Sequence, residues 1–100
     1  MPEFRTEVTH QLGEGPAVER LKGFVEDARS RFEDHLQKAE GAWRGNVLEF
    51  SLKAAGFTVT GQLTVEEAVA RVQGQLPFLA VPMRGVIEQQ IAEHLRSELS

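Results

Sequence analysis

The sequence contains no cysteine, no long hydrophobic run and no excess of basic residues, and each absence excludes a class of function. Without cysteine there are no disulfides, thiolate metal sites or cysteine nucleophiles. No apolar run approaches the roughly 20 residues of a membrane span, and the N-terminus lacks the basic-then-apolar pattern of a signal peptide. Fifteen acidic against eleven basic residues give a net charge of −4. We therefore expect no binding to nucleic acid, because the phosphate backbone requires a basic surface.

The composition that remains is that of a folded domain. Hydrophobic residues make up 41% of the 100 residues and charged residues 26%, close to the globular average. A chain of this length forms one domain with one core. We therefore treat residues 1–100 as a single domain.

Period-two patterns predict four strands. Residues 4–12 place Phe4, Val8, His10 and Leu12 on one face. Three further alternating segments follow, at 48–54, 57–65 and 68–76. A two-residue turn at 55–56 would place Leu52 opposite Val59 and Phe50 opposite Gly61, and one at 66–67 would place Val65 opposite Ala68, so that apolar faces coincide in both hairpins. Two glutamates are poor turn residues, so a wider loop at 66–67 remains open.

Period-3.6 patterns predict two helices. The first begins at Pro16 and continues for about six turns to Ala39, weakened at Gly23 and ending at Gly41. The second runs from about Met83 to Leu99 after an apolar connector. Its apolar stripe comprises Met83, Val86, Ile87, Ile91 and Leu95.

These elements predict an α+β fold with the order β-α-β-β-β-α. Each helix has one apolar stripe and the sheet has one apolar face, so both helices should cover that face of a four-stranded, mainly antiparallel sheet as a two-layer sandwich. The predicted core comprises Val25, Phe32, Leu48, Phe50, Phe57, Val59, Leu63, Val72, Ile87 and Ile91.

Several short segments, in order, resemble a known family. They are His10-Gln11-Leu12-Gly13, Trp43 with Val47-Leu48-Glu49-Phe50, Val59-Thr60-Gly61-Gln62-Leu63, Leu76-Pro77-Phe78-Leu79 and Ile87-Glu88-Gln89-Gln90-Ile91. The chain resembles the polyhydroxyalkanoic acid system proteins, a bacterial family also called the polyhydroxyalkanoate granule-region family. The resemblance implies a cytoplasmic accessory factor of polyester storage and brings no catalytic residue with it. The layout is also similar to a small helix-grip fold, a likeness at the level of fold alone.

The three histidines are the most informative polar residues. His10 lies on the apolar face of the first strand, His94 within the stripe of the last helix, and His35 at the edge of the first helical stripe. Three inward imidazoles could form a metal or acid–base site, but no His-x-x-x-His spacing is present. We interpret them as core histidines with satisfied nitrogens, and we expect no metal, no cofactor and no catalytic residue. Among them, His10 is the candidate to test first.

Two aromatic positions are candidates for contact with a partner. Trp43 lies at a strand entrance between glycines, and Phe78 lies with Leu79 in the apolar connector. Each could close an end of the sandwich or project toward an apolar partner. Trp43, Phe78, Leu79 and His10 are therefore the predicted binding residues.

Three functions remain open from the sequence. The first is an accessory protein that contacts polyester granules or granule proteins through an apolar surface. The second is a carrier with a cavity for an acyl or other apolar ligand between the sheet and the last helix. The third is a small enzyme that uses His10. The sequence gives no oligomeric state.

Overall fold

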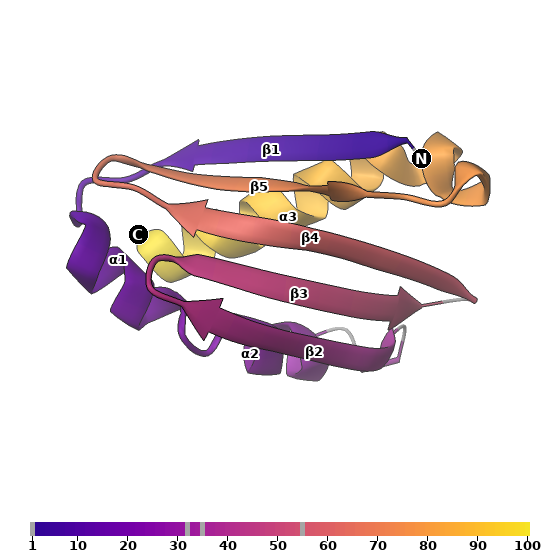
Figure 1. The fold of residues 1–100 in the computed structure, drawn as a ribbon, viewed down its shortest axis with the longest axis horizontal. Coiled ribbons are helices and arrows are strands. Elements are labelled where there is room, and N and C mark those ends of the chain that lie inside the picture. The colour runs from indigo at the N-terminus through magenta and orange to yellow at the C-terminus, as the bar shows by residue number, and fades with distance from the viewer. Residues whose placement is uncertain (1, 32, 35, 55) are drawn as a thin grey trace.

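The computed structural model describes residues 2–31, 33–34, 36–54 and 56–100, and its strands form one antiparallel sheet (Figure 1). The strands are β1 (Glu3–Thr9), β2 (Leu36–Arg44), β3 (Val47–Ala54), β4 (Phe57–Val65) and β5 (Val69–Gln75), in the order β1-β5-β4-β3-β2. The helices are α1 (Glu14–Leu21), α2 (Phe24–Arg31), the 3-10 helix η1 (Phe78–Met83) and α3 (Arg84–Leu99). The α+β class is confirmed, but the sheet has five strands where the sequence predicted four.

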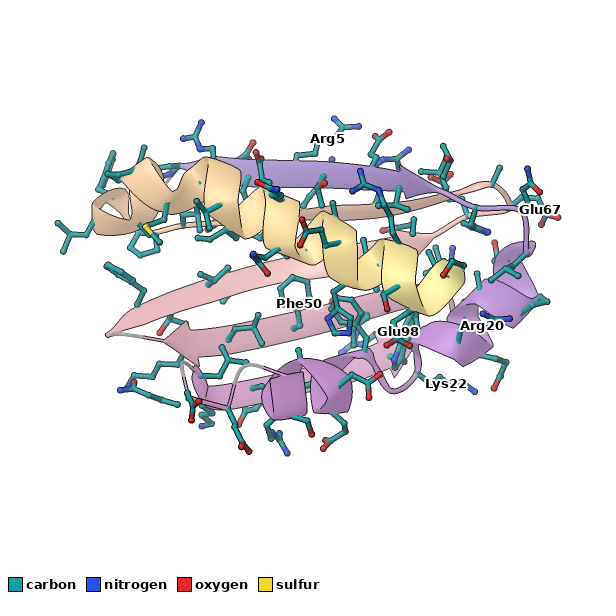
Figure 2. All side chains as sticks on the ribbon, turned by 180° about the vertical axis from the view of Figure 1, so that it is seen from behind. Arg5, Arg20, Lys22, Phe50, Glu67 and Glu98 are labelled. Atoms are coloured by element: carbon teal, nitrogen blue, oxygen red, sulfur yellow. The ribbon has the colours of Figure 1, made fainter. Side chains whose placement is uncertain are left out.

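The helices α2 and α3 lie on the same side of the sheet. They lie behind the strands in Figure 1 and in front of them in the reverse view of Figure 2. Buried side chains from the sheet and from the helices form one cluster, in which Phe4, Leu48 and Leu63 of the sheet join Leu21 and Leu95 of the helices. The opposite positions of the strands, such as Glu49 and Gln73, are exposed.

The predicted long first helix is wrong in its last part. The helix breaks around Gly23 into α1 and α2, and the chain from Leu36 onward forms β2, which pairs with β3. A register shift lies between Leu36 and Lys38. A bulge inserts one extra residue, so Leu36 and Ala39 are three residues apart although their partners Ala54 and Leu52 are only two residues apart on β3. That spacing equals the i, i+3 spacing of a helix, which is why hydrophobic periodicity predicted a helix in this segment.

The two predicted hairpins differ in outcome. In the β3–β4 hairpin Leu52 pairs with Val59 and Phe50 with Gly61, as predicted. Ala55, in the predicted turn, lies outside the described residues. In the β4–β5 hairpin Val65 pairs with Ala70 rather than with Ala68, because the loop is wider and closes with the Glu66 N–H donating to the Val69 carbonyl at 2.7 Å. The shift is two residues, so every side chain keeps its predicted face.

The predicted core is largely confirmed. Leu48, Phe50, Leu63 and Val72 are buried. Five others pack against this cluster while remaining partly exposed, namely Val25, Phe57, Val59, Ile87 and Ile91. Phe32 lies outside the described residues.

Two glycines make room for two phenylalanines in the middle of the sheet. Phe50, Gly61, Gly74 and Phe4 are neighbours across four strands. A Cβ added at Gly61 would lie 2.9 Å from Cζ of Phe50, and one at Gly74 would lie 2.5 Å from Cε1 of Phe4. Both rings therefore occupy space that only glycine leaves open.

Candidate functional site

Large apolar side chains are exposed where η1 leads into α3. Phe78 is 77% exposed and Leu79 is 81% exposed. Met83 and Val86 follow, each about half exposed. We call these four residues the terminal apolar patch. Single exposed apolar residues are ordinary, but four within a short stretch of chain are a surface feature suited to contact.

The local backbone explains why Phe78 and Leu79 point outward. Leu76 is fully buried and its N–H donates to the Pro2 carbonyl at 2.8 Å. Ala80 is also buried, and its N–H donates to the Pro77 carbonyl at 2.9 Å. The chain is thus anchored on both sides of the two exposed residues, by a buried residue and a main-chain hydrogen bond on each side.

Three of the four residues of the terminal apolar patch, Phe78, Leu79 and Met83, lie in a segment without charge. The eight residues from Leu76 to Met83 include no charged side chain, and Arg84 is the first charge that follows. A segment of this kind favours contact with an uncharged apolar surface over a charged one, because no ion pair could form with it.

Two members of this patch correct the sequence analysis. Met83 and Val86 were expected in the buried stripe of the last helix, yet both are exposed. Met83 belongs to η1, where helical periodicity of α3 does not apply, and Val86 lies in the first turn of α3. The buried residues of α3 start further along, at Ala92.

Trp43 lies apart from the patch. It is half-buried in β2, packs against the core cluster and lines a hollow with Val25 and Leu48. Figure 1 places the arrowhead end of β2 and the η1 segment at opposite ends of the sheet. The fold therefore does not bring Trp43 together with Phe78 and Leu79.

His10 is buried at the end of β1, on the apolar face as predicted, and both of its ring nitrogens contact main-chain groups. Its Nε2 lies 2.9 Å from the Glu66 carbonyl oxygen, and the Leu12 N–H donates to its Nδ1 at 3.2 Å. A carbonyl oxygen only accepts, so Nε2 is the donor in the first contact, and Nδ1 is the acceptor in the second. These contacts fasten β1 to the β4–β5 loop, and they occupy the nitrogens that acid–base catalysis would use.

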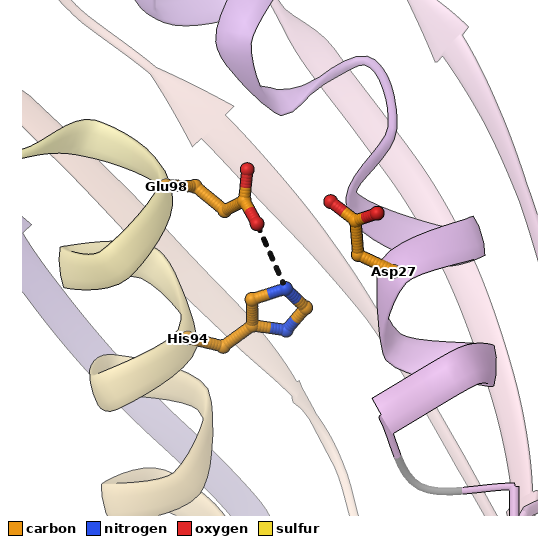
Figure 3. Close-up of side chains that lie close together, drawn as sticks. All are labelled: Asp27, His94 and Glu98. Atoms are coloured by element: carbon orange, nitrogen blue, oxygen red, sulfur yellow. Dashed lines mark ion pairs between the residues drawn. The ribbon is translucent and has the colours of Figure 1, made fainter.

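His94 has different surroundings from His10. It is 2% exposed, and its ring stacks on Phe24 with the ring centroids 4.5 Å apart. Its Nε2 lies 3.6 Å from Oε1 of Glu98, one helical turn later, and Asp27 of α2 faces the pair (Figure 3). The spacing from His94 to Glu98 is visible in the sequence, but Asp27 joins them only through the packing of two helices. His35 lies outside the described residues.

The carrier hypothesis requires a cavity between the sheet and α3. One hollow in the described chain lies over the exposed side of the sheet, where Arg5, Gln62 and Gln73 line it. Another lies between α2 and β2. Neither of these two hollows lies between the sheet and α3, so they lend no support to an enclosed apolar ligand.

The fold and its surface define a class of protein: a small antiparallel α+β protein with an exposed apolar end. The family model for "putative polyhydroxyalkanoic acid system protein" matches residues 5–99, and the chain therefore belongs to this family. The family predicted from the sequence is thus confirmed. A search of curated proteins finds no match to the chain. Within the described part of the chain, no helix has the length and apolar character needed to cross a membrane.

Proposed function

We propose that the protein is a non-catalytic accessory factor of the bacterial polyhydroxyalkanoate storage system, acting in the cytoplasm by docking on the polyester surface of storage granules. The family links the chain to this storage system. The observation that carries the docking proposal is the exposure of Phe78 and Leu79 on an uncharged segment. A polyester surface is uncharged and largely apolar, which matches the chemistry of this segment.

The energy available from the terminal apolar patch suits reversible docking. Removing apolar surface from water contributes about 25 cal/mol per Å². Covering ~200 Å² of the patch would contribute ~5 kcal/mol before the costs of association and side-chain ordering. The net affinity is then modest, as expected for a protein that exchanges between granule and solution.

Co-sedimentation with purified granules tests the proposal. The wild-type protein should pellet with granules, and Phe78→Ser and Leu79→Ser should each reduce the bound fraction several-fold. Both side chains are more than three quarters exposed, so these variants should keep the fold, which circular dichroism would check.

Trp43→Ser provides the matched aromatic control at the other end of the sheet. It should leave granule binding unchanged, provided that the variant remains folded. Binding lost only in Trp43→Ser would place the contact at that end and contradict the proposal. Binding that requires granule proteins, and is lost once they are stripped, would show a protein partner in place of the polyester.

A further inference from the structure

We propose that Asp27, His94 and Glu98 form a binding site for a first-row divalent metal ion, represented by Zn²⁺, between α2 and α3. The three side chains converge from two helices that are far apart in the sequence (Figure 3). Each offers one donor atom, and these atoms all lie within 4.8 Å of one another. Such a site is independent of granule docking.

The separations suit a small ion. In a tetrahedral zinc site with bonds near 2.1 Å, neighbouring donor atoms are roughly 3.4 Å apart. The His94 Nε2 to Glu98 Oε1 distance is already 3.6 Å. Small rotations of the Asp27 and Glu98 side chains would bring the remaining atoms to that separation, because neither carboxylate is deeply buried.

The surroundings hold the imidazole ring and the two helix ends in place. Stacking on Phe24 fixes the plane of the His94 ring. The Asp27 N–H donates to the Gly23 carbonyl at 2.8 Å, in the first turn of α2. Arg20 of α1 donates to the Ser100 carbonyl at 2.8 Å and so fastens the end of α3 beside Glu98 (Figure 2). The stacked ring and the anchored helix ends leave only the Asp27 and Glu98 side chains to be ordered when an ion binds.

The local charge favours a cation. Two carboxylates face one imidazole. The two helix ends act in opposite directions, because Glu98 lies in the last turn of α3 and Asp27 in the first turn of α2, so the attraction for a cation comes from the carboxylates themselves. The imidazole selects for a transition metal over Mg²⁺ or Ca²⁺, which prefer oxygen ligands. Three protein ligands would also leave a fourth tetrahedral position open for water.

The site lies away from the terminal apolar patch. Val86 and Glu98 are twelve residues apart on α3, which corresponds to roughly 18 Å along the helix. Substitutions at one place can therefore be tested without disturbing the other, and failure of either proposal would leave the other unaffected.

Titration of the untagged, chelator-treated full chain with Zn²⁺ tests the site by calorimetry, with the visible absorption of bound Co²⁺ as a second readout. We expect one equivalent to bind with micromolar affinity. Glu98→Gln and Asp27→Asn should each weaken binding at least tenfold. Glu93→Gln is the matched control, since Glu93 is an exposed acid on the same helix outside the cluster, and it should bind as the wild type does.

His94→Asn should also abolish binding, but this side chain is buried and its loss could unfold the protein. The two carboxylate variants therefore carry the test, with circular dichroism as the check on folding. No uptake of Zn²⁺ or Co²⁺ by the wild type would overturn the proposal. So would equal affinity in the wild type, Glu98→Gln and Asp27→Asn, because the ion would then be held elsewhere on the surface.

Discussion

At the scale of single residues, the same side-chain type takes two different roles. His10 contacts only main-chain groups and fastens a loop, whereas His94 faces two carboxylates across a helix interface. Alternation along the first strand was enough to predict that His10 points inward. The surroundings of His94 could not be predicted, because Asp27 is brought to it by the packing of α2 against the rest of the fold.

The exposed carboxyl of Glu7 gives a prediction at this scale. A hydrogen bond from Arg5 at 2.7 Å and a second from Arg71 at 3.0 Å lower the pKa of Glu7 below its ordinary value. A lowered pKa in the folded state stabilises the protein above the unfolded-state pKa, and this contribution is lost as the pH falls through the folded-state value. Since Glu7 is well exposed, the effect on stability is small.

Carboxyl NMR of Glu7 during an acid titration would check this. The pKa should rise toward the ordinary glutamate value in Arg5→Gln and also in Arg71→Gln. An unchanged pKa in both variants would show that neither arginine pairs with Glu7 in solution.

At the scale of elements, hydrophobic periodicity located the strands well and failed at one bulge. The three later strands and the register of the β3–β4 hairpin follow from alternation and from a short turn. The prediction for the segment that forms β2 was wrong, because the irregularity after Leu36 gives this strand the apolar spacing of a helix. The exposure of Phe78 and Leu79 was one of two open alternatives, since periodicity does not reveal which residues of a connector find buried space.

The packing of Phe50 over Gly61 gives the prediction for the sheet. Phe50→Ala removes a buried ring, and glycine on the neighbouring strand cannot fill the cavity. We expect a loss of ~3–5 kcal/mol in the free energy of unfolding, a large part of the stability of a domain this small. Urea denaturation followed by the fluorescence of the single tryptophan would measure it.

Phe78→Ala is the matched control, because it removes the same ring from a position that is 77% exposed. It should change the free energy of unfolding by no more than about 0.5 kcal/mol. If Phe50→Ala loses less than about 1 kcal/mol, Phe50 does not pack in the core as described.

At the scale of the whole molecule, charge limits the choice of partner. The chain carries a net charge of −4, and the phosphate backbone attracts proteins through clustered lysine and arginine. We therefore predict no measurable binding to duplex DNA of unrelated sequence at physiological salt. Micromolar binding in a mobility-shift assay would contradict this prediction and the assignment of function with it.

Direct binding to bare polyester tests the central claim, that the protein docks through the terminal apolar patch. The measurement is a binding isotherm on protein-free polyhydroxyalkanoate particles for the wild type and for the double variant Phe78→Ser/Leu79→Ser. The wild type should bind saturably. The double variant should bind at least about tenfold more weakly, because it lacks the two apolar side chains whose removal from water stabilises the contact. Equal binding by the two proteins, or no binding by the wild type, would contradict the claim.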